Sequence, residues 1–292
     1  MFKGSIVAIV TPFKNGAVDE KALSELIEWH IKEGTNAIVP CGTTGESATL
    51  DYKEHYRVIE ITIKVVNRRI PVIAGTGANS TDETIMITRK AKEMGADGAL
   101  LVAPYYNKPT QEGLYRHYKM VAEQVDIPIV LYNVPGLTAV NMLPHTVARL
   151  TEMKNIVAIK EATGDMRQVS DIIRLCGDRM TVISGDDFTT FALLALGGKG
   201  VISVSANVAP RDVASMLKAW EEGKIDEARR LHFKLEPLNQ AMFIETNPIP
   251  AKTALSMMGK IQEEFRLPLC PMSSDNKEKL RNVLVNYGVI SK

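Results

Sequence analysis

The chain alternates short apolar runs with longer segments of helical periodicity, and this alternation limits its fold more than any other feature. Each run is followed by a polar loop, and there are eight of them, at residues 5–10, 37–40, 71–74, 99–103, 128–132, 156–160, 181–184 and 200–203. Short, uninterrupted and often β-branched runs are typical of parallel strands covered on both faces. Eight of them predict an α/β fold, a closed (β/α)8 TIM barrel. A doubly wound open sheet is the alternative, because periodicity does not establish closure.

Amphipathic segments lie between and after the runs. We expect helices over 20–32, 53–66, 82–94, 111–124, 145–151, 165–175, 187–196 and 210–220, which implies parallel strands joined by right-handed crossovers. The remainder contains only predicted helices, over 226–238, 250–258 and 276–287. We therefore predict a barrel catalytic domain over 1–224 and a C-terminal helical region over 225–292. No low-complexity linker separates these regions, so we expect little independent motion.

Composition and charge indicate which partners the chain does not suit. Of its 292 residues, 45% are hydrophobic and 24% are charged, which is ordinary for a globular protein with a large core. Thirty-five basic residues nearly balance 34 acidic ones. The sequence therefore has no electrostatic footprint for nucleic acid or for an anionic membrane, and we expect small-molecule chemistry.

Targeting and metal-binding patterns are also missing from the sequence. The N-terminal apolar stretch is interrupted by Thr11 and Pro12 and is too short for a signal peptide. No segment reaches the roughly 18 apolar residues of a membrane span, so we expect a cytoplasmic protein. Three cysteines outside any CxxC pattern indicate reduced thiols. Five histidines with no HxxxH pair predict no metal site.

Functional side chains of a (β/α)8 barrel lie at the carboxyl ends of its strands, and several reactive groups follow the apolar runs here. Lys160 ends one run, Tyr132 ends another, and Tyr105 and Tyr106 follow a third. Each group alone is also compatible with a structural role, as a solvated strand-end lysine or a packed ring. Together they supply the amine and the proton donors that imine chemistry needs.

A glycine- and threonine-rich loop follows the second run. Residues 41–47 read CGTTGES, in which two glycines allow a tight turn and Thr43 and Thr44 offer hydroxyls and amides. Such a loop can bind a small carboxylate. The structural alternative is a β–α turn in which Ser47 or Thr49 caps the next helix.

The sequence resembles a known family nearly end to end. The matching segments are SIVAIVTPF, GTTGESATL, PVIAGTGAN, PYYNKPTQEGLYRHY, LYNVP, IVAIKEATGD, SGDD, GVISVSANV and NPIPAK. They are similar to the 4-hydroxy-tetrahydrodipicolinate synthases, or dihydrodipicolinate synthases, of the pyruvate-dependent class I aldolase and N-acetylneuraminate lyase superfamily. The resemblance implies the predicted barrel with its helical appendage. It also implies an aldolase-type carbon–oxygen lyase that condenses pyruvate with L-aspartate 4-semialdehyde in lysine (diaminopimelate) biosynthesis.

The resemblance assigns roles to the strand-end residues. Lys160 would form a Schiff base with pyruvate, so that no separate cofactor is needed. Tyr132 would transfer protons and would be linked through the Thr43 hydroxyl to Tyr106 of a neighbouring subunit. Thr44, with the Thr43 amide, would hold the pyruvate carboxylate. The backbones of two further residues would line the pocket: Gly185 and Ile202.

One position departs from the family pattern. After LYNVP the synthases continue with a small residue, arginine and threonine, but here Gly136 is followed by Leu137 and Thr138. The missing guanidinium would grip the carboxylate of the second substrate. Its loss costs about 1.5–3 kcal/mol, and we expect turnover of the aldehyde to be impaired roughly tenfold to a hundredfold. Leucine here resembles N-acetylneuraminate lyase, so two alternatives remain: an aldolase for a sugar acid (N-acetylneuraminate or 2-keto-3-deoxygluconate type), and a pyruvate-binding barrel with little turnover.

The resemblance also raises regulation and assembly. Lysine-inhibited synthases bind L-lysine at an interface through positions that match six residues here: Ser47, Ala48, His55, Asn79, Glu83 and Tyr105. Tyr52 stands where histidine is common. A cationic amino acid would suit the Glu83 carboxylate. The tyrosine relay implies a homo-oligomer, in this family usually a homotetramer built as a dimer of dimers.

Overall fold

The computed structural model describes residues 2–291. Eight parallel strands alternate with helices along the chain and further helices follow the last strand, which confirms the prediction of a (β/α)8 barrel with C-terminal helices. The chain divides into two compact units. One comprises Pro71–Ile202 with Phe2 and Lys3, and the other comprises Gly4–Ile70 with residues 203–291. The predicted division at residue 224 stays a prediction.

The Pro71–Ile202 unit contains most of the strands in the order in which they occur along the chain. Their bounds are β5 Ile73–Gly75, β6 Gly98–Val102, β7 Ile129–Asn133, β8 Ile156–Glu161, β9 Thr181–Ser184 and β10 Gly200–Ser203, the last residue of which begins the other unit. All of the pairs are parallel. The β7–β8 register places Tyr132 opposite Lys160 and Asn133 opposite Glu161.

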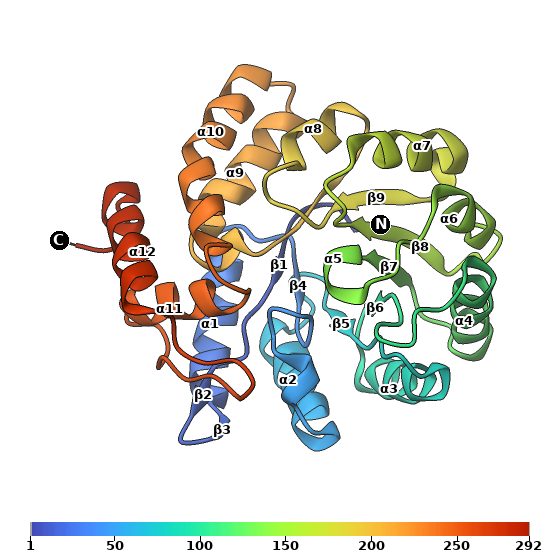
Figure 1. Ribbon diagram of the computed structural model, residues 1–292, viewed down its shortest axis with the longest axis horizontal. Helices are drawn as coiled ribbons and strands as arrows, with labels where there is room; N and C mark the ends of the chain where they lie inside the picture. The colour runs from blue at the N-terminus through green and yellow to red at the C-terminus, as the bar shows by residue number, and fades with distance from the viewer. Residues whose placement is uncertain (1, 292) are drawn as a thin grey trace. The chain divides into compact units, whose positions relative to one another are not determined.

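Helices cover the outer side of these strands. They are α3 Thr81–Met94, α4 Gln111–Gln124, α6 Pro144–Leu150, α7 Met166–Cys176 and α8 Thr190–Ala195, whereas the short helix α5 (Pro135–Thr138) directly follows the carboxyl end of β7. Figure 1 shows α3, α4, α6 and α7 outside the strands. Apolar side chains fill the space between the two layers, among them the fully buried Leu101, Leu131 and Ile159. Asp165 caps α7 by accepting from the amides of Arg167 and Gln168.

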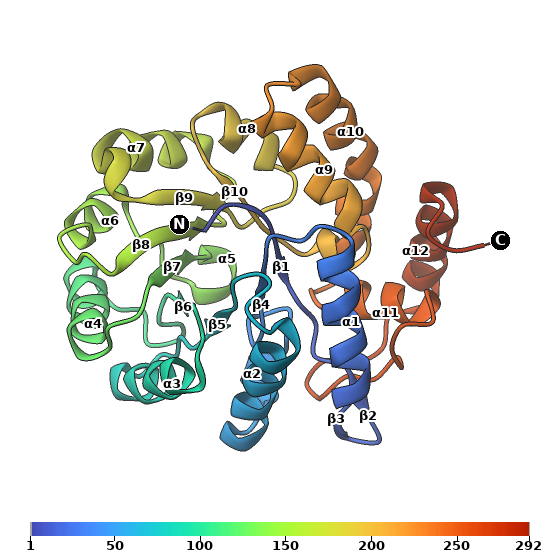
Figure 2. The ribbon, with the colours of Figure 1, turned by 180° about the vertical axis from the view of Figure 1, so that it is seen from behind.

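The second unit combines the first two barrel strands with the C-terminal helices. Strand β1 (Gly4–Ala8) pairs with β4 (Ala37–Val39). The helices are α1 Glu20–Lys32, α2 Tyr52–Val66, α9 Pro210–Glu221, α10 Ile225–Met242, α11 Ile249–Met257 and α12 Ser274–Tyr287. Figure 2 shows α9 and α10 side by side, with the chain continuing through α11 to α12.

Most predicted elements agree with the structure to within two residues, and the differences have local causes. A small hairpin, β2 (Phe13–Lys14) and β3 (Ala17–Val18), was not predicted, because two-residue strands have no periodicity to read. Helix α10 continues past Pro237 to Met242, although proline normally ends a helix. Helix α2 is capped by Asp51 in a capping box with Glu54, so the structural alternative for the loop, in which Ser47 or Thr49 caps this helix, is wrong.

Three features that bear on the chain's class can be read directly from residues 2–291. Over that range, no helix combines the length and the apolar character that crossing a bilayer requires. All three cysteines are free, with Cys41 and Cys176 buried and Cys270 exposed. No cluster of three or more histidine, cysteine or acidic side chains suited to a metal ion occurs within the same range.

Candidate active site

Lys160 and Tyr132 lie together at the carboxyl ends of β8 and β7. Both side chains are buried, with 5% and 6% of their surfaces exposed. The Lys160 Nζ atom lies 4.2 Å from the centroid of the Tyr132 ring. The parallel register that pairs these two residues therefore brings the lysine amine and the tyrosine phenol close together. A buried lysine is unusual, because an ammonium loses much of its hydration when it leaves water.

A buried polar network holds these two strand ends next to each other. The Glu161 carboxylate accepts from Asn133 Nδ2 at 3.0 Å, from Gln168 Nε2 at 3.2 Å and from the Thr163 amide at 2.8 Å. The Asn133 amide group also donates to Asn141 Oδ1 at 2.8 Å. Since Asn133 and Glu161 directly follow Tyr132 and Lys160, their hydrogen bonds fix the backbone from which both reactive side chains project.

Gly185 leaves the room that the Lys160 side chain occupies. Its amide donates to the Glu161 carbonyl at 2.7 Å. A Cβ atom at Gly185 would lie 2.7 Å from Ala162 Cβ and 2.9 Å from Lys160 Cε and Cγ. These distances are well inside van der Waals contact. Glycine is therefore required here for steric reasons, and its role in the site is to let the lysine pass.

Gly185→Ala should displace the Lys160 side chain and slow the imine formation with pyruvate that the resemblance implies for Lys160 by about tenfold to a hundredfold, because small misplacements of a reacting group are costly. Borohydride trapping over time measures this rate. Gly136→Ala is the matched control, since a Cβ there meets nothing within 4 Å. Equal trapping rates for Gly185→Ala and the unaltered protein would show that the glycine does not constrain the lysine.

The remaining predicted residues of this unit differ in exposure. Ile202 is fully buried in β10. Leu137 is 59% exposed in the short helix α5, and its amide donates to the Val134 carbonyl. Tyr106 is 90% exposed and has a φ of 72°, a left-handed conformation that is unfavourable for a bulky residue. The structure therefore presents the Tyr106 ring to the outside of the chain.

The glycine- and threonine-rich loop belongs to the other unit, where it follows β4. Thr44 is buried and Thr43 is half-buried. The Thr44 hydroxyl accepts from Asn247 Nδ2 at 3.0 Å, which leaves its own proton free to donate. Within the loop, the Glu46 amide donates to the Thr43 carbonyl at 3.0 Å. The loop is thus a closed turn that contains a hydroxyl donor; the binding of a carboxylate there stays a prediction.

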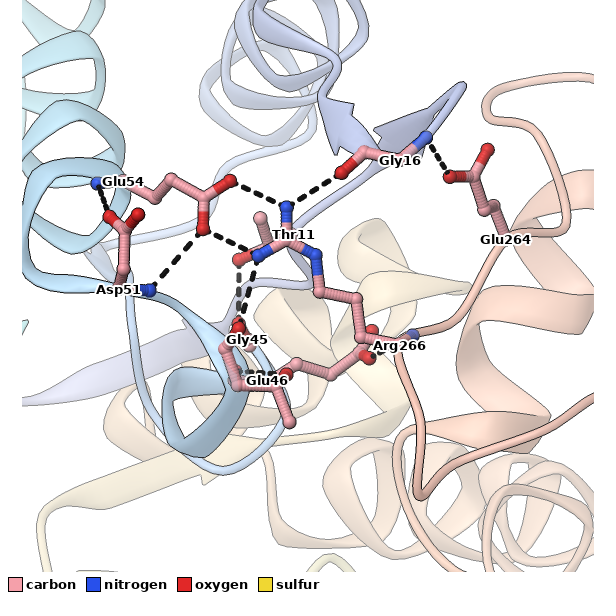
Figure 3. A network of polar contacts seen from close by, with 9 residues as sticks. Thr11, Gly16, Gly45, Glu46, Asp51, Glu54, Glu264 and Arg266 are labelled. Atoms are coloured by element: carbon pink, nitrogen blue, oxygen red, sulfur yellow. Dashed lines mark hydrogen bonds and ion pairs between the residues drawn. The ribbon is translucent and has the colours of Figure 1, made fainter.

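Residues from the C-terminal region form hydrogen bonds with this loop. Lys252, which is fully buried in α11, donates to Glu46 Oε1 at 2.5 Å, and the Arg266 amide donates to Glu46 Oε2 at 3.2 Å. The Thr11 hydroxyl donates to the Gly45 carbonyl at 2.7 Å. Figure 3 shows the part of this network around Arg266. Neither Asn247 nor Lys252 was predicted from the sequence to have a role, although both lie in the NPIPAK segment that carried the resemblance.

The Arg266 guanidinium joins the loop to the start of α2. It donates to both carboxylate oxygens of Glu54 at 2.5 Å, to the Thr49 carbonyl at 3.0 Å and to the Gly16 carbonyl at 2.9 Å. These hydrogen bonds hold the pKa of the Glu54 carboxyl below its ordinary value of 4.5. Because folding lowers this pKa, the Glu54–Arg266 pair stabilises the fold fully at pH values above 4.5, the ordinary pKa. This stabilisation is lost as the pH falls through the lower pKa of the folded state.

Glu54→Gln should therefore lower the free energy of unfolding by about 1–2 kcal/mol at pH 7, and the difference should shrink as the pH falls below 4.5. Urea unfolding at several pH values measures it. Glu28→Gln is the control, because the exposed Glu28–Arg69 pair has the same two-bond geometry and should contribute less. A difference that does not vary with pH would contradict the assignment.

The residues matched to a lysine effector are distributed over both units. Burial, and next the nearby Glu83 carboxylate, raise the pKa of the Tyr105 phenol. The Asn79 carbonyl accepts from Asn107 Nδ2 at 2.8 Å. In the other unit, His55 is buried in α2, and Ser47 and Ala48 form a short 3-10 turn, η1 (Ser47–Thr49). Tyr105 and Glu83 are thus neighbours.

Comparisons with known proteins agree with these features. The model of the dihydrodipicolinate synthetase family matches residues 1–286. The 4-hydroxy-tetrahydrodipicolinate synthase of Thermodesulfovibrio yellowstonii is 73% identical over 290 residues, which cover 99% of this chain and 100% of that protein. The crystal structure of dihydrodipicolinate synthase from Aquifex aeolicus is 53% identical and superposes with a TM-score of 0.98, with all of both chains covered.

Two further solved structures contain small molecules. The chloride-inhibited dihydrodipicolinate synthase from Acinetobacter baumannii, complexed with pyruvate, is 52% identical, with a TM-score of 0.98 over 99% of this chain and 100% of that one. The enzyme from Cyanidioschyzon merolae with lysine bound is 40% identical, with a TM-score of 0.96 over 99% of both chains. Full-length identity at this level, with the fold and the strand-end lysine described above, shows that the chain belongs to the dihydrodipicolinate synthetase family.

Proposed function

We propose that this lyase condenses pyruvate with L-aspartate 4-semialdehyde through a Schiff base on Lys160, and so acts as a 4-hydroxy-tetrahydrodipicolinate synthase in lysine biosynthesis. The observation that carries the proposal is the buried Lys160 amine, 4.2 Å from the Tyr132 ring centroid at adjacent strand ends. The 73% identical relative that has this name supports the reaction class. The pyruvate complex of a 52% identical relative supports the first substrate. The biosynthetic role suits the cytoplasmic location expected from the sequence.

The chemistry follows from the nucleophilic nitrogen of a lysine side chain. The Lys160 nitrogen attacks the C2 carbonyl of pyruvate, the carbinolamine loses water, and an imine forms. Loss of a proton from the pyruvate methyl group gives an enamine, whose carbon attacks the aldehyde carbon of the semialdehyde. The amino group of the second substrate then attacks the imine carbon and displaces the lysine, which closes the ring. One water is released overall, and Lys160 is regenerated.

Neighbouring residues would bind the substrate and move the protons. In our proposal the Tyr132 phenol accepts and donates protons at the carbinolamine and enamine steps, and the Thr43 hydroxyl connects it to Tyr106 of a second subunit. The exposure of the Tyr106 ring suits a residue that serves another chain. Thr44, whose hydroxyl proton is free, would donate to the pyruvate carboxylate together with the Thr43 amide. The backbones of Gly185 and Ile202 would line the pocket.

Borohydride reduction in the presence of pyruvate tests the imine. Reduction makes the adduct permanent, and mass analysis of the peptide that bears Lys160 should show it. An adduct on another lysine, or none, would contradict the proposal. A coupled assay with aspartate semialdehyde then tests the second half of the reaction. If the unaltered protein forms the pyruvate adduct but does not turn over the semialdehyde, it is a pyruvate-binding barrel and not a synthase.

A sugar-acid aldolase is the second candidate, and exposed Leu137 is the observation that favours it. An apolar side chain stands where a guanidinium would bind the carboxylate of the second substrate. A second substrate without a carboxylate therefore loses less binding energy through this difference than aspartate semialdehyde does. Cleavage of N-acetylneuraminate or 2-keto-3-deoxygluconate to pyruvate at a rate comparable with the condensation would support this candidate. The synthase remains the better proposal, because the relatives that match the full chain have that name.

Assembly and regulation complete the proposal. The relay through a second Tyr106 requires at least a dimer, and we propose a homotetramer built as a dimer of dimers. We also propose L-lysine as a feedback effector, supported by the lysine complex of a 40% identical relative. The Glu83 carboxylate beside Tyr105 is a suitable partner for its ammonium group. Light scattering and inhibition by added lysine measure these two properties.

A further inference from the structure

The buried ion pair behind the glycine- and threonine-rich loop is the strongest polar feature that the proposed chemistry does not use. The side chains of Lys252 and Glu46 are 0% and 1% exposed, and their charged atoms are 2.5 Å apart. The Phe13 ring lies 4.2 Å from the ammonium, and the Phe265 ring lies 5.2 Å from it. Water therefore screens this pair very little, and its attraction is much stronger than that of a surface pair.

The pair is attached to a strained part of the loop. Glu46 has a φ of 53° and Cys41 a φ of 55°, both in the left-handed region that favours glycine. Such conformations persist only when surrounding contacts enforce them. Here both Glu46 oxygens have donors, Lys252 on one and the Arg266 amide on the other. The side chain of Glu46 is thus held in place on both sides while its backbone closes the turn on Thr43.

Stability alone does not account for such a pair. A buried lysine and carboxylate lose so much hydration that a well-packed apolar pair of the same shape is often equally stable or more stable. What the charges do provide is a single geometry, because neither group can move without leaving the other unpaired in an apolar environment. The loop that gains this geometry is the one that contains Thr43 and Thr44.

We propose that Lys252 and Glu46 are positioning residues, whose ion pair holds loop residues 42–47 in the conformation that binds the carboxylate of pyruvate. The carboxylate part of this inference depends on the proposed function, whereas the loop part does not. The pair touches no reacting atom and acts through the loop backbone. Its loss therefore weakens the capture of pyruvate, and the chemistry that follows capture is affected less.

Two variants test the proposal. Lys252→Met leaves Glu46 buried without its partner, and Lys252→Met with Glu46→Gln removes both charges, so that folding is preserved if the single variant unfolds. Hydrogen exchange followed by mass spectrometry measures the amides of Glu46 and Ser47, which donate within the loop. Borohydride trapping over a range of pyruvate concentrations measures half-saturation. Lys277→Met is the control, because it removes another C-terminal lysine–glutamate pair, with Glu263.

We expect faster exchange of the loop in the double variant and a pyruvate half-saturation at least about tenfold higher, with the trapping rate at saturating pyruvate within about threefold of the unaltered protein. The Lys277→Met control should match the unaltered protein. Unchanged loop exchange in the double variant would overturn the proposal, as would faster exchange with unchanged half-saturation, or an equal effect of Lys277→Met. If the unaltered protein forms no adduct, the proposed function has failed, and loop exchange alone then decides whether the pair holds the loop.

Discussion

Lys160→Met is expected to abolish the pyruvate adduct and to lower kcat/KM by at least about 10⁴-fold, because removal of a covalent nucleophile leaves no alternative route through an imine. The fold should be kept, since methionine fills a similar volume and the buried site no longer has to accommodate a polar amine. Circular dichroism and thermal unfolding check the fold, and mass analysis after borohydride reduction checks the adduct.

Lys154→Met is the matched control for this variant. Lys154 precedes the same strand but is exposed, so its removal should leave trapping unchanged. Within residues 2–291, the buried lysines are Lys160 and Lys252. An adduct that persists in Lys160→Met would therefore indicate Lys252 as the nucleophile. It would contradict both the assignment of Lys160 as the nucleophile and the positioning role proposed for Lys252.

Leu137→Arg is expected to raise kcat/KM for aspartate semialdehyde by about tenfold to a hundredfold. A guanidinium there would regain a charge-assisted contact of about 1.5–3 kcal/mol with the carboxylate of the second substrate, at about 1.4 kcal/mol per factor of ten. The Leu137 side chain is 59% exposed, so a longer side chain needs no repacking. Pyruvate trapping should not change, since this contact is to the second substrate.

Leu137→Gln distinguishes charge from length at the same position. Glutamine can donate a hydrogen bond but carries no charge, so it should recover little of the gain expected for arginine. If neither variant changes turnover of the semialdehyde, the second carboxylate is bound elsewhere and the impairment attributed to Leu137 does not exist. If both variants abolish cleavage of a sugar acid, leucine serves the aldolase reaction.

Hydrophobic periodicity and helix-end signals in the sequence predicted the helices and strands whose bounds depend on nearby residues. Helices α1 and α4 have the predicted bounds, because amphipathic periodicity and polar ends mark them clearly. The proximity of Tyr132 and Lys160 could also be predicted from the sequence, since each residue ends an apolar run and parallel strands end at the same edge of the sheet. The β2–β3 hairpin and the passage of α10 through Pro237 depend on tertiary packing, which no short sequence pattern contains.

The support of the site was much harder to predict than its reactive groups. Glu46 and Lys252 are 206 positions apart, and each alone is an ordinary charged residue whose expected place is the surface. Gly185 similarly gives no sign that its missing side chain makes room for Lys160. Such relations are set by three-dimensional proximity, and only the NPIPAK segment in the resemblance pointed toward Asn247 and Lys252.

The attachments of Lys252 and Arg266 have a consequence for how this chain can be divided or recombined. Both come from the helical region that follows the last strand, and both grip a loop from the first fifty residues. A fragment ending after the eighth strand would retain the nucleophile and the threonines but would leave Glu46 as an uncompensated internal anion. The terminal region is therefore tied to the loop that contains Glu46, and exchanging the terminal helices between relatives should succeed only when the segment that contains Glu46 is exchanged with them.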